Sequence, residues 1–216
     1  MARHIIWDFD GTLFDTYPAV ADVFMEVLAG FCINADRDEV LQLLHKSLAD
    51  TYDCFSARHS IDRETLRSRF IETEEAMDVS LALPFPGARE MLSLVIRNGG
   101  LNLIYTNRGG STFNFLAHSG FSEYFREVVT RDDGFGRKPS PDCINYFLEK
   151  YSLDKNEVMM VGDREIDMLA AINAGIKTCY FDSHGLPIDM ETDIRIDSLY
   201  ELETHLSPGP DPNPSA

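Results

Sequence analysis

The sequence predicts an α/β protein: a parallel sheet with helices on both faces, interrupted by one all-helical insert. Residues 4–7 form a continuous apolar run, which is typical of a strand buried on both faces of a parallel sheet. From residue 84 onward, short apolar runs alternate with segments of helical periodicity, the pattern of strands joined by crossover helices. Between residues 17 and 83 the periodicity is helical throughout.

The insert is expected to contain about four helices. Pro18 suits the first turn of the first helix, whose apolar residues recur at helical spacing: Val20, Phe24, Val27, Leu28 and Phe31. Three further helices are expected over residues 36–46, over residues 48–58 and from Asp62 onward. The segment Leu83-Pro84-Phe85-Pro86-Gly87 then ends the insert, because its prolines and glycine interrupt a helix.

The rest of the chain is expected to continue the sheet. Helices are predicted over residues 88–98, 111–118, 141–151, 165–174 and 197–205, with strands over residues 101–105, 127–130, 157–161 and 176–181. We therefore expect an α/β core of residues 1–15 and 84–206 and a helical domain of residues 16–83. The proline-rich residues 207–216 are expected to be disordered.

Composition excludes several classes of protein. The hydrophobic fraction of 44% fits a globular protein, and the formal net charge of −17 without a run of Lys or Arg argues against nucleic-acid binding. The four cysteines lie far apart without a CxxC pair, which argues against a zinc site. No apolar stretch is long enough to cross a bilayer, and residues 1–4 lead directly into the first strand, so no signal peptide is expected. We expect a reduced, soluble, cytoplasmic protein; nothing in the sequence identifies a protein partner.

Two carboxylates follow the first strand directly. Asp8 and Asp10 are two positions apart, and such residues of an extended chain point the same way. Gly11 then allows a sharp turn, and Thr12 adds a hydroxyl beside the acids. A strand that ends in an Asx turn with solvated carboxylates would explain one aspartate but not two, because neighbouring buried acids repel each other and lose hydration. The pair therefore predicts a bound cation or a proton-transfer role.

Other polar residues follow the later strands. Thr106 and Asn107 come after one strand, Asp163 comes after another, and Asp167 lies one helical turn farther on. Lys138 lies in a loop that leads into a helix. Because ligands of open parallel sheets bind beyond the carboxyl ends of the strands, we expect these residues to lie on one rim with the first two acids.

Such a rim has a definite chemistry. Two like charges about 4 Å apart cost on the order of 4 kcal/mol at an effective dielectric constant of about 20, and a hard divalent cation such as Mg²⁺ removes most of that repulsion. The cation together with Lys138 would attract a phosphate dianion. One carboxylate can then attack phosphorus to form an acyl phosphate, while a second acid protonates the departing alcohol. The Thr106 hydroxyl and Lys138 can hold the non-bridging oxygens.

These motifs resemble, in type and order, the four signature regions of the haloacid dehalogenase superfamily of phosphohydrolases. They are Asp8-Phe9-Asp10-Gly11-Thr12, Thr106-Asn107, Lys138-Pro139 and Gly162-Asp163-Arg164-Glu165-Ile166-Asp167. The resemblance spans residues 5–181. The insert just after the first motif, with Pro86-Gly87 at its end, is similar to the phosphoglycolate-phosphatase-like branch, which implies a Rossmann-like core with a small helical cap.

The resemblance implies a role for each acid. Asp8 would be the nucleophile, and Asp10 the general acid and then the base. Mg²⁺ would be held by the Asp8 carboxylate, the main-chain carbonyl of Asp10 and Asp163, while Asp167 would support the metal's waters or Lys138. Because dehalogenating members lack an acid at the position of Asp10, dehalogenation is disfavoured.

The resemblance also implies how the substrate is bound. Thr106 and Asn107 would bind its phosphate, and Lys138 would steady both the nucleophile and the phosphoryl group. The expected activity is Mg²⁺-dependent hydrolysis of a small phosphate monoester, a phosphorylated metabolite, with a cap that closes over the acids and sets specificity. Phosphoglycolate, a sugar phosphate, a nucleotide and pyrophosphate all stay open as substrates.

Two other functions stay open as well. A sugar phosphomutase of the beta-phosphoglucomutase type would share Asp8 and Asp10 but return the phosphoryl group to a sugar. A catalytically idle member would only bind a phosphorylated metabolite or a partner protein, although a mere binder has no use for two repelling acids. The segment Arg108-Gly109-Gly110-Ser111 is interpreted as a simple turn with Ser111 as a helix cap, and Trp7 as a core residue.

Overall fold

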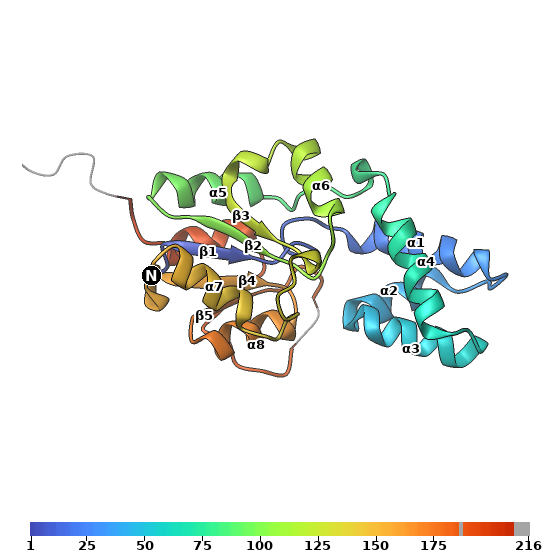
Figure 1. Cartoon of the computed structure of the whole chain (residues 1–216). Coiled ribbons are helices and arrows are strands. Elements are labelled where there is room, and N and C mark those ends of the chain that lie inside the picture. Colours follow the sequence, from blue (N-terminus) through green and yellow to red (C-terminus); the bar gives the residue numbers. More distant parts are fainter. Residues whose placement is uncertain (186–187, 210–216) are drawn as a thin grey trace, which may run out of the picture. The chain divides into compact units, whose positions relative to one another are not determined.

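The computed structural model describes residues 1–185 and 188–209, and the chain divides into two compact units (Figure 1). One unit, the core, comprises residues 1–14 and the chain from residue 84 onward. The other, the helical unit, comprises residues 15–83. Most of the tail predicted to be disordered, residues 210–216, lies outside the described residues.

Six parallel strands form the sheet of the core, in the order β3-β2-β1-β4-β5-β6. They are β1 (His4–Trp7), β2 (Asn102–Tyr105), β3 (Phe125–Val129), β4 (Val158–Gly162), β5 (Lys177–Phe181) and β6 (Ile194–Ile196). Strand β1 pairs with β2 on one side and β4 on the other, so Trp7 lies opposite both Ile104 and Val161. The carboxyl ends of these three strands are therefore neighbours.

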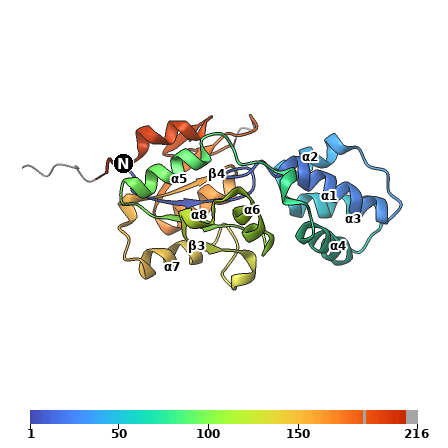
Figure 2. The same ribbon diagram turned by 90° about the horizontal axis from the view of Figure 1, so that it is seen from above.

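Helices cover both faces of this sheet, which confirms the predicted fold class. In Figure 1, α5 (Ala88–Arg97) lies above the strands, and α7 (Asp142–Lys150) and α8 (Glu165–Ala174) lie below them. Helix α8 packs against β4, β5 and α7. On the other face α5 packs beside the 3-10 helix η5 (Leu199–His205), as Figure 2 shows. Helix α6 (Ser111–Ser119) follows β2.

Trp7 lies in the core, as predicted. It is fully buried, and its indole Nε1 donates a hydrogen bond of 2.9 Å to Asn102 Oδ1. The Asn102 amide in turn donates to the Leu92 carbonyl oxygen, also at 2.9 Å, so both polar groups are satisfied without water. Because Asn102 opens β2 and Leu92 belongs to α5, these bonds tie β1 and β2 to the helix that covers them.

The helical unit contains α1 (Tyr17–Gly30), α2 (Arg37–Lys46), α3 (Leu48–His59), α4 (Arg63–Glu75) and the 3-10 helix η1 (Val79–Leu81). Its own core is aromatic: the Phe24 ring centroid lies 5.7 Å from that of Phe55 and 5.5 Å from that of Phe70. Helices α2, α3 and α4 each begin with a side-chain cap, supplied by Asp36, Ser47 and Asp62. Within the part of the chain that the structure describes, no helix combines the length and the apolar character needed to cross a membrane.

Two predicted details of the core are wrong. The final segment is not an α-helix over residues 197–205 but the 3-10 helix η5. A short amphipathic segment has the same apolar pattern in both forms, because three- and four-residue spacings differ little over two turns. Strand β6 was not predicted, since its three residues are too few to show an alternation that differs from chance.

Glu127, on the edge strand β3, forms hydrogen bonds with α7 and with Tyr151, the residue that follows this helix. Its Oε1 accepts hydrogen bonds from the Tyr146 hydroxyl and Lys150 Nζ, both at 2.9 Å. Its Oε2 accepts one of 2.6 Å from the Tyr151 hydroxyl. Partial burial alone would raise the pKa of Glu127, but the bonds from Lys150 and the two tyrosines outweigh it and lower that pKa.

We expect Glu127→Gln to lower the free energy of unfolding by about 1 kcal/mol at neutral pH, a modest value because Lys150 is exposed. Glu149→Gln, on the exposed side of α7, is the matched control and should change it by less than about 0.5 kcal/mol. Because the native pKa of Glu127 is lowered, its stabilisation exists above the ordinary pKa of 4.5 and is lost as the pH falls. Urea unfolding curves at several pH values measure these free energies. Equal losses of stability in Glu127→Gln and Glu149→Gln would contradict a stabilising role for the Glu127 hydrogen bonds.

Candidate active site

Asp8 lies at the carboxyl end of the central strand and is buried, with 1% of its surface exposed. Its backbone N–H donates to the Val161 carbonyl oxygen at 2.9 Å, which extends the pairing of β1 with β4 and fixes where the side chain leaves the sheet. One carboxylate oxygen, Oδ1, accepts a hydrogen bond of 2.5 Å from Lys138 Nζ. The other, Oδ2, is buried and accepts no hydrogen bond from the described residues.

Lys138 joins two buried carboxylates. Its Nζ lies 2.5 Å from Asp8 Oδ1 and 2.7 Å from Asp167 Oδ1, and all three side chains are shielded from solvent. Burial by itself lowers the pKa of Lys138, but the negative charges of Asp167 and Asp8 outweigh it, so that pKa is raised and the lysine stays charged. The arrangement therefore places one positive charge between two acids.

One lysine does not balance two buried carboxylates. Burial, the largest effect, and the charge of Asp167 together raise the pKa of Asp8 from 3.8 to about 6, although Lys138 and Arg164 act in the opposite direction. A cation placed against Asp8 Oδ2 would remove this cost, because it would supply both the missing charge and the missing partner.

Three carboxylates converge where such a cation would lie. One oxygen each of Asp8, Asp163 and Asp167 lies within 4.8 Å of the others. The Thr12 hydroxyl donates to Asp163 Oδ1 at 3.2 Å. Asp167 Oδ2 accepts from the Arg164 backbone N–H at 3.1 Å and caps the start of α8. This set of hard oxygen donors, two of them buried, fits Mg²⁺ better than the softer metals that prefer nitrogen or sulfur.

Gly162, the last residue of β4, allows this approach. A Cβ atom on Gly162 would lie 2.4 Å from Asp167 Cβ and 2.6 Å from both Asp167 Cγ and Oδ2. Such distances are far inside van der Waals contact, so any side chain at this position would push the first turn of α8 away from the strand end.

We expect Gly162→Ala to cost about 2 kcal/mol of stability and to weaken Mg²⁺ binding, because Asp167 must move. Gly30→Ala is the control: a Cβ there meets nothing within 4 Å, and the change should be neutral or slightly stabilising. Thermal unfolding with and without Mg²⁺ measures both effects. An unchanged melting temperature and metal affinity in Gly162→Ala would contradict the close packing described here.

Thr106 and Asn107 follow β2, next to β1 in the sheet. Thr106 is buried, and its Oγ1 accepts a hydrogen bond of 3.0 Å from the Arg108 backbone N–H. Accepting this bond leaves the hydroxyl proton of Thr106 available to a ligand. Asn107 is partly exposed, and within residues 1–185 and 188–209 its side chain makes no hydrogen bond or ion pair with the acids.

Asp10 is not part of the group of three carboxylates but forms an ion pair with Arg108. Arg108 Nη2 lies 2.8 Å from Asp10 Oδ1, and Arg108 Nε lies 2.9 Å from Oδ1 and 3.2 Å from Oδ2. The interpretation of Arg108 to Ser111 as a simple turn capped by Ser111 is therefore wrong. The N-cap of α6 is Gly110, without a side-chain bond, and Ser111 Oγ instead accepts from Arg108 Nη1 at 3.2 Å.

The structure thus joins four of the predicted site residues directly, Asp8, Lys138, Asp163 and Asp167. Thr106 is connected to Asp10 through Arg108, a residue whose importance no local pattern indicates, because its partner lies 98 positions earlier. The proposed roles of these residues in catalysis stay predictions.

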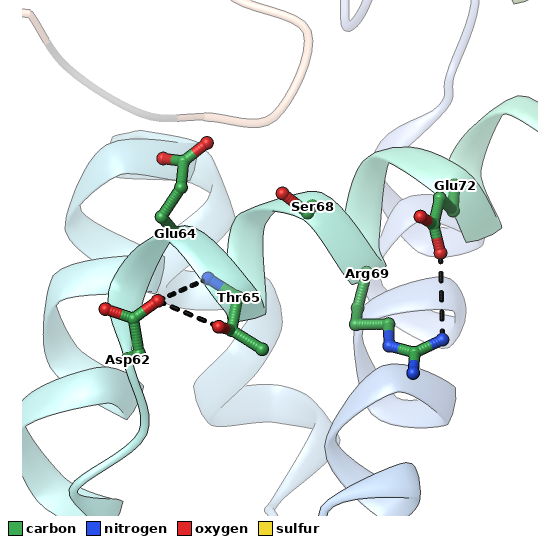
Figure 3. A pocket seen from close by; sticks show the side chains of 6 residues that line it. All are labelled: Asp62, Glu64, Thr65, Ser68, Arg69 and Glu72. Atoms are coloured by element: carbon green, nitrogen blue, oxygen red, sulfur yellow. Dashed lines mark hydrogen bonds and ion pairs between the residues drawn. The ribbon is translucent and has the colours of Figure 1, made fainter.

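A separate hollow lies on the helical unit, along one side of α4 (Figure 3). Its lining residues are all exposed: Asp62, Glu64, Thr65, Ser68, Arg69 and Glu72. Asp62 caps α4 by accepting bonds from the backbone and hydroxyl of Thr65, and Arg69 pairs with Glu72 at 3.7 Å. This hollow lacks the buried charges found at Asp8, Lys138 and Asp167.

Solved structures share the fold. A HAD-superfamily hydrolase of subfamily IA from Geobacter sulfurreducens PCA superposes with a TM-score of 0.75 at 22% identity, covering 95% of this chain and 100% of that one. A hydrolase from Streptococcus pneumoniae TIGR4 is 32% identical, with a TM-score of 0.60 and coverage of 82% and 91%.

Curated relatives align over most of the chain. A phosphoglycolate phosphatase of Vibrio vulnificus (strain YJ016) is 30% identical over 92% of this chain and 93% of that protein. The pyrophosphatase PpaX of Oceanobacillus iheyensis is 27% identical over 82% and 81%. The pyrimidine 5'-nucleotidase YjjG of Escherichia coli (strain K12) is 27% identical over 92% and 95%. The model of the haloacid dehalogenase-like hydrolase family matches residues 5–181, which contain all four motifs, and the chain belongs to that family.

Proposed function

We propose that this protein is a Mg²⁺-dependent phosphatase that hydrolyses a small phosphate monoester through an aspartyl phosphate on Asp8. The observation that carries the proposal is the environment of the buried Asp8. Lys138 contacts one of its carboxylate oxygens, the other accepts no hydrogen bond from the described residues, and one oxygen each of Asp163 and Asp167 lies within 4.8 Å of an Asp8 oxygen. A folded protein gains nothing from gathering these charges unless a cation and an anionic ligand complete them.

In the proposed reaction, a carboxylate oxygen of Asp8 attacks phosphorus, and the bond from phosphorus to the leaving-group oxygen breaks. Asp10 gives its proton to that oxygen, so an alcohol departs and an aspartyl phosphate remains. A water molecule then attacks phosphorus, Asp10 takes up its proton, and the bond between phosphorus and Asp8 breaks. The products are inorganic phosphate and the original Asp8.

The other residues support these steps electrostatically. Asp8, Asp163 and the main-chain carbonyl of Asp10 would hold Mg²⁺, with Asp167 beside them; the ion, when bound, polarises the phosphoryl oxygens and offsets the acids' charge. Lys138 and the free hydroxyl proton of Thr106 would bind the non-bridging oxygens, together with Asn107. That residues 16–83 act as a cap and set specificity stays a prediction.

The named relatives guide the choice of substrates. They include a phosphoglycolate phosphatase, a pyrophosphatase and a pyrimidine nucleotidase. We propose phosphoglycolate as the first substrate to test, because that relative has the highest identity of the three over nearly the whole chain. A small phosphorylated metabolite of the cytoplasm is the partner that this function implies.

The test is phosphate release from a panel of compounds, with Mg²⁺ and with a chelator. The panel contains phosphoglycolate, pyrophosphate, pyrimidine 5'-monophosphates and hexose phosphates. We expect Mg²⁺-dependent release from at least one of them. Isomerisation of a hexose 1-phosphate without net phosphate release would instead identify a mutase, and no turnover with any compound would contradict the proposal.

Asp163→Ala is expected to raise the Mg²⁺ concentration required for half-maximal activity by about 10- to 100-fold, because one of the two carboxylates proposed to bind the ion directly is lost. Glu165→Ala is the matched control, since Glu165 is exposed and lies only two residues away. Calorimetric titration with Mg²⁺ gives the affinity independently of turnover. An unchanged titration in Asp163→Ala would remove this residue from the metal site.

A further inference from the structure

Arg108 lies just beyond the phosphate-binding residues predicted at the end of β2. Its backbone is fixed on both sides: its N–H donates to Thr106 Oγ1 at 3.0 Å, and its carbonyl oxygen accepts from the Arg131 N–H at 3.0 Å. The side chain therefore starts from a defined point at the strand end and leads back toward β1.

The guanidinium of Arg108 is enclosed. Only 1% of the side chain is exposed, and its central carbon lies 5.2 Å from the centre of the Phe115 ring and 5.9 Å from that of Phe9. Ser111 Oγ accepts from Nη1. A planar group packed against rings and bonded at its edge has little freedom to turn, which makes it a rigid support.

The same guanidinium contacts both oxygens of Asp10. Nε reaches Oδ1 at 2.9 Å and Oδ2 at 3.2 Å, and Nη2 reaches Oδ1 at 2.8 Å. Such multiple contacts fix the orientation of a carboxylate as well as its place. The two acids of the first motif thus have different cations: Lys138 contacts Asp8, and Arg108 contacts Asp10.

We propose that Arg108 is a positioning residue that orients the Asp10 carboxylate for its two proton transfers. The inference rests on the proposed function, because it assigns the support of an acid that this function requires. Arg108 acts through Asp10 rather than on the substrate, since its side chain is nearly inaccessible and its donors already contact Asp10 and Ser111. Through Thr106 it also ties the predicted phosphate-binding loop to this acid.

The test compares two esters that differ in their need for a proton. An alkyl phosphate, phosphoglycolate, releases a strongly basic alkoxide that needs the acid, whereas p-nitrophenyl phosphate releases a stable phenolate that does not. The quantity to compare is kcat/KM, because it reports the steps up to departure of the leaving group and not the later hydrolysis. The variants are Arg108→Gln, Asp10→Asn and the double substitution, with Arg89→Gln as an exposed control that also lies over aromatic rings.

We expect Arg108→Gln to lower kcat/KM for the alkyl phosphate by about 100-fold, mainly through kcat, and that for p-nitrophenyl phosphate by less than about 5-fold. In the Asp10→Asn background, Arg108→Gln should lower kcat/KM by less than about a further 3-fold, because the acid that Arg108 positions is already absent. Mg²⁺ affinity should stay at the wild-type value. Arg89→Gln should leave both esters unaffected.

Equal losses for both esters, or losses that multiply fully in the double variant, would overturn the proposal, since a structural or substrate-binding role predicts them. If Arg108→Gln does not fold, Arg108→Lys replaces it, and about a 10-fold loss confined to the alkyl ester is expected, because the charge stays but the multiple contacts are lost. Failure of the proposed function is recognised separately: wild-type protein would then hydrolyse neither ester, and the role of Arg108 would fall with it.

Discussion

Replacing Asp8 with asparagine is expected to abolish phosphate release while the protein stays folded. The amide has nearly the shape of the carboxylate, but it lacks the charge and the nucleophilic oxygen that the reaction requires. For every substrate that the wild-type protein hydrolyses, we expect the kcat of Asp8→Asn to be lower than that of the wild type on the order of 10⁴-fold or more.

The fold should tolerate this change because the charged form of Asp8 is costly. Burial and Asp167 raise the pKa of Asp8 to about 6, so the ionised group weakens the metal-free native state above the ordinary pKa of 3.8. At neutral pH without metal, Asp8→Asn should therefore unfold at the same temperature as the wild type or a higher one.

A matched control for Asp8→Asn is Asp154→Asn. Asp154 is exposed and caps a short 3-10 helix by accepting from the Asn156 N–H, which an asparagine also does. This variant should keep full activity and stability. Substantial turnover by Asp8→Asn, measured on protein free of deamidated material, would eliminate Asp8 as the nucleophile.

Lys138→Met is expected to be the most destabilising single change at the site. It removes a positive charge that contacts both Asp8 and Asp167, and leaves two buried carboxylates side by side. Loss of one partner from a buried ion pair typically costs about 3–5 kcal/mol, and we expect a loss of this size at neutral pH. Activity should fall as well, because the phosphoryl oxygens lose their cation.

Two conditions should reduce the cost of Lys138→Met. As the pH falls below the raised pKa of Asp8, protonation removes one of the repelling charges, so the gap to the wild type should narrow. Added Mg²⁺ should raise the melting temperature of this variant more than that of the wild type, because the ion replaces the lost charge.

The control is Lys46→Met, at the exposed end of α2, which should change stability by less than about 0.5 kcal/mol. Melting curves at two pH values, each with and without Mg²⁺, measure all three effects. A Lys138→Met protein as stable as the wild type would contradict the buried charge balance described here.

The sequence was sufficient to predict that Asp8, Asp163 and Asp167 meet, but not that Asp10 is paired with Arg108 instead of grouped with them. The rule that ligands bind beyond the carboxyl ends of parallel strands places Asp8 and Asp163 together even though the strand order is not encoded locally. The observed order, with β1 directly beside β4, supplies the physical reason. The structure also places Lys138 between two of the acids.

Arg108 could not be found in this way. A glycine pair and a serine after an arginine indicate a turn with a serine cap, but the structure has no such cap, and the arginine's partner is 98 positions away. The available signal is physical rather than local: Lys138 is paired with Asp8, so the neighbouring Asp10 requires another cationic partner. The short β6 and the 3-10 form of η5 were missed for a different reason, because so few residues carry no distinctive periodicity.

The measurement that tests the central claim most directly is a search for phosphate on Asp8 during turnover. Enzyme with Mg²⁺ and its best substrate is quenched in acid within the first turnovers, digested and analysed by mass spectrometry. The account predicts one phosphoryl group on the peptide that contains Asp8, absent from Asp8→Asn and from enzyme treated with chelator. Rapid turnover with no phosphoryl group on that peptide, or with one on a different residue, would contradict it.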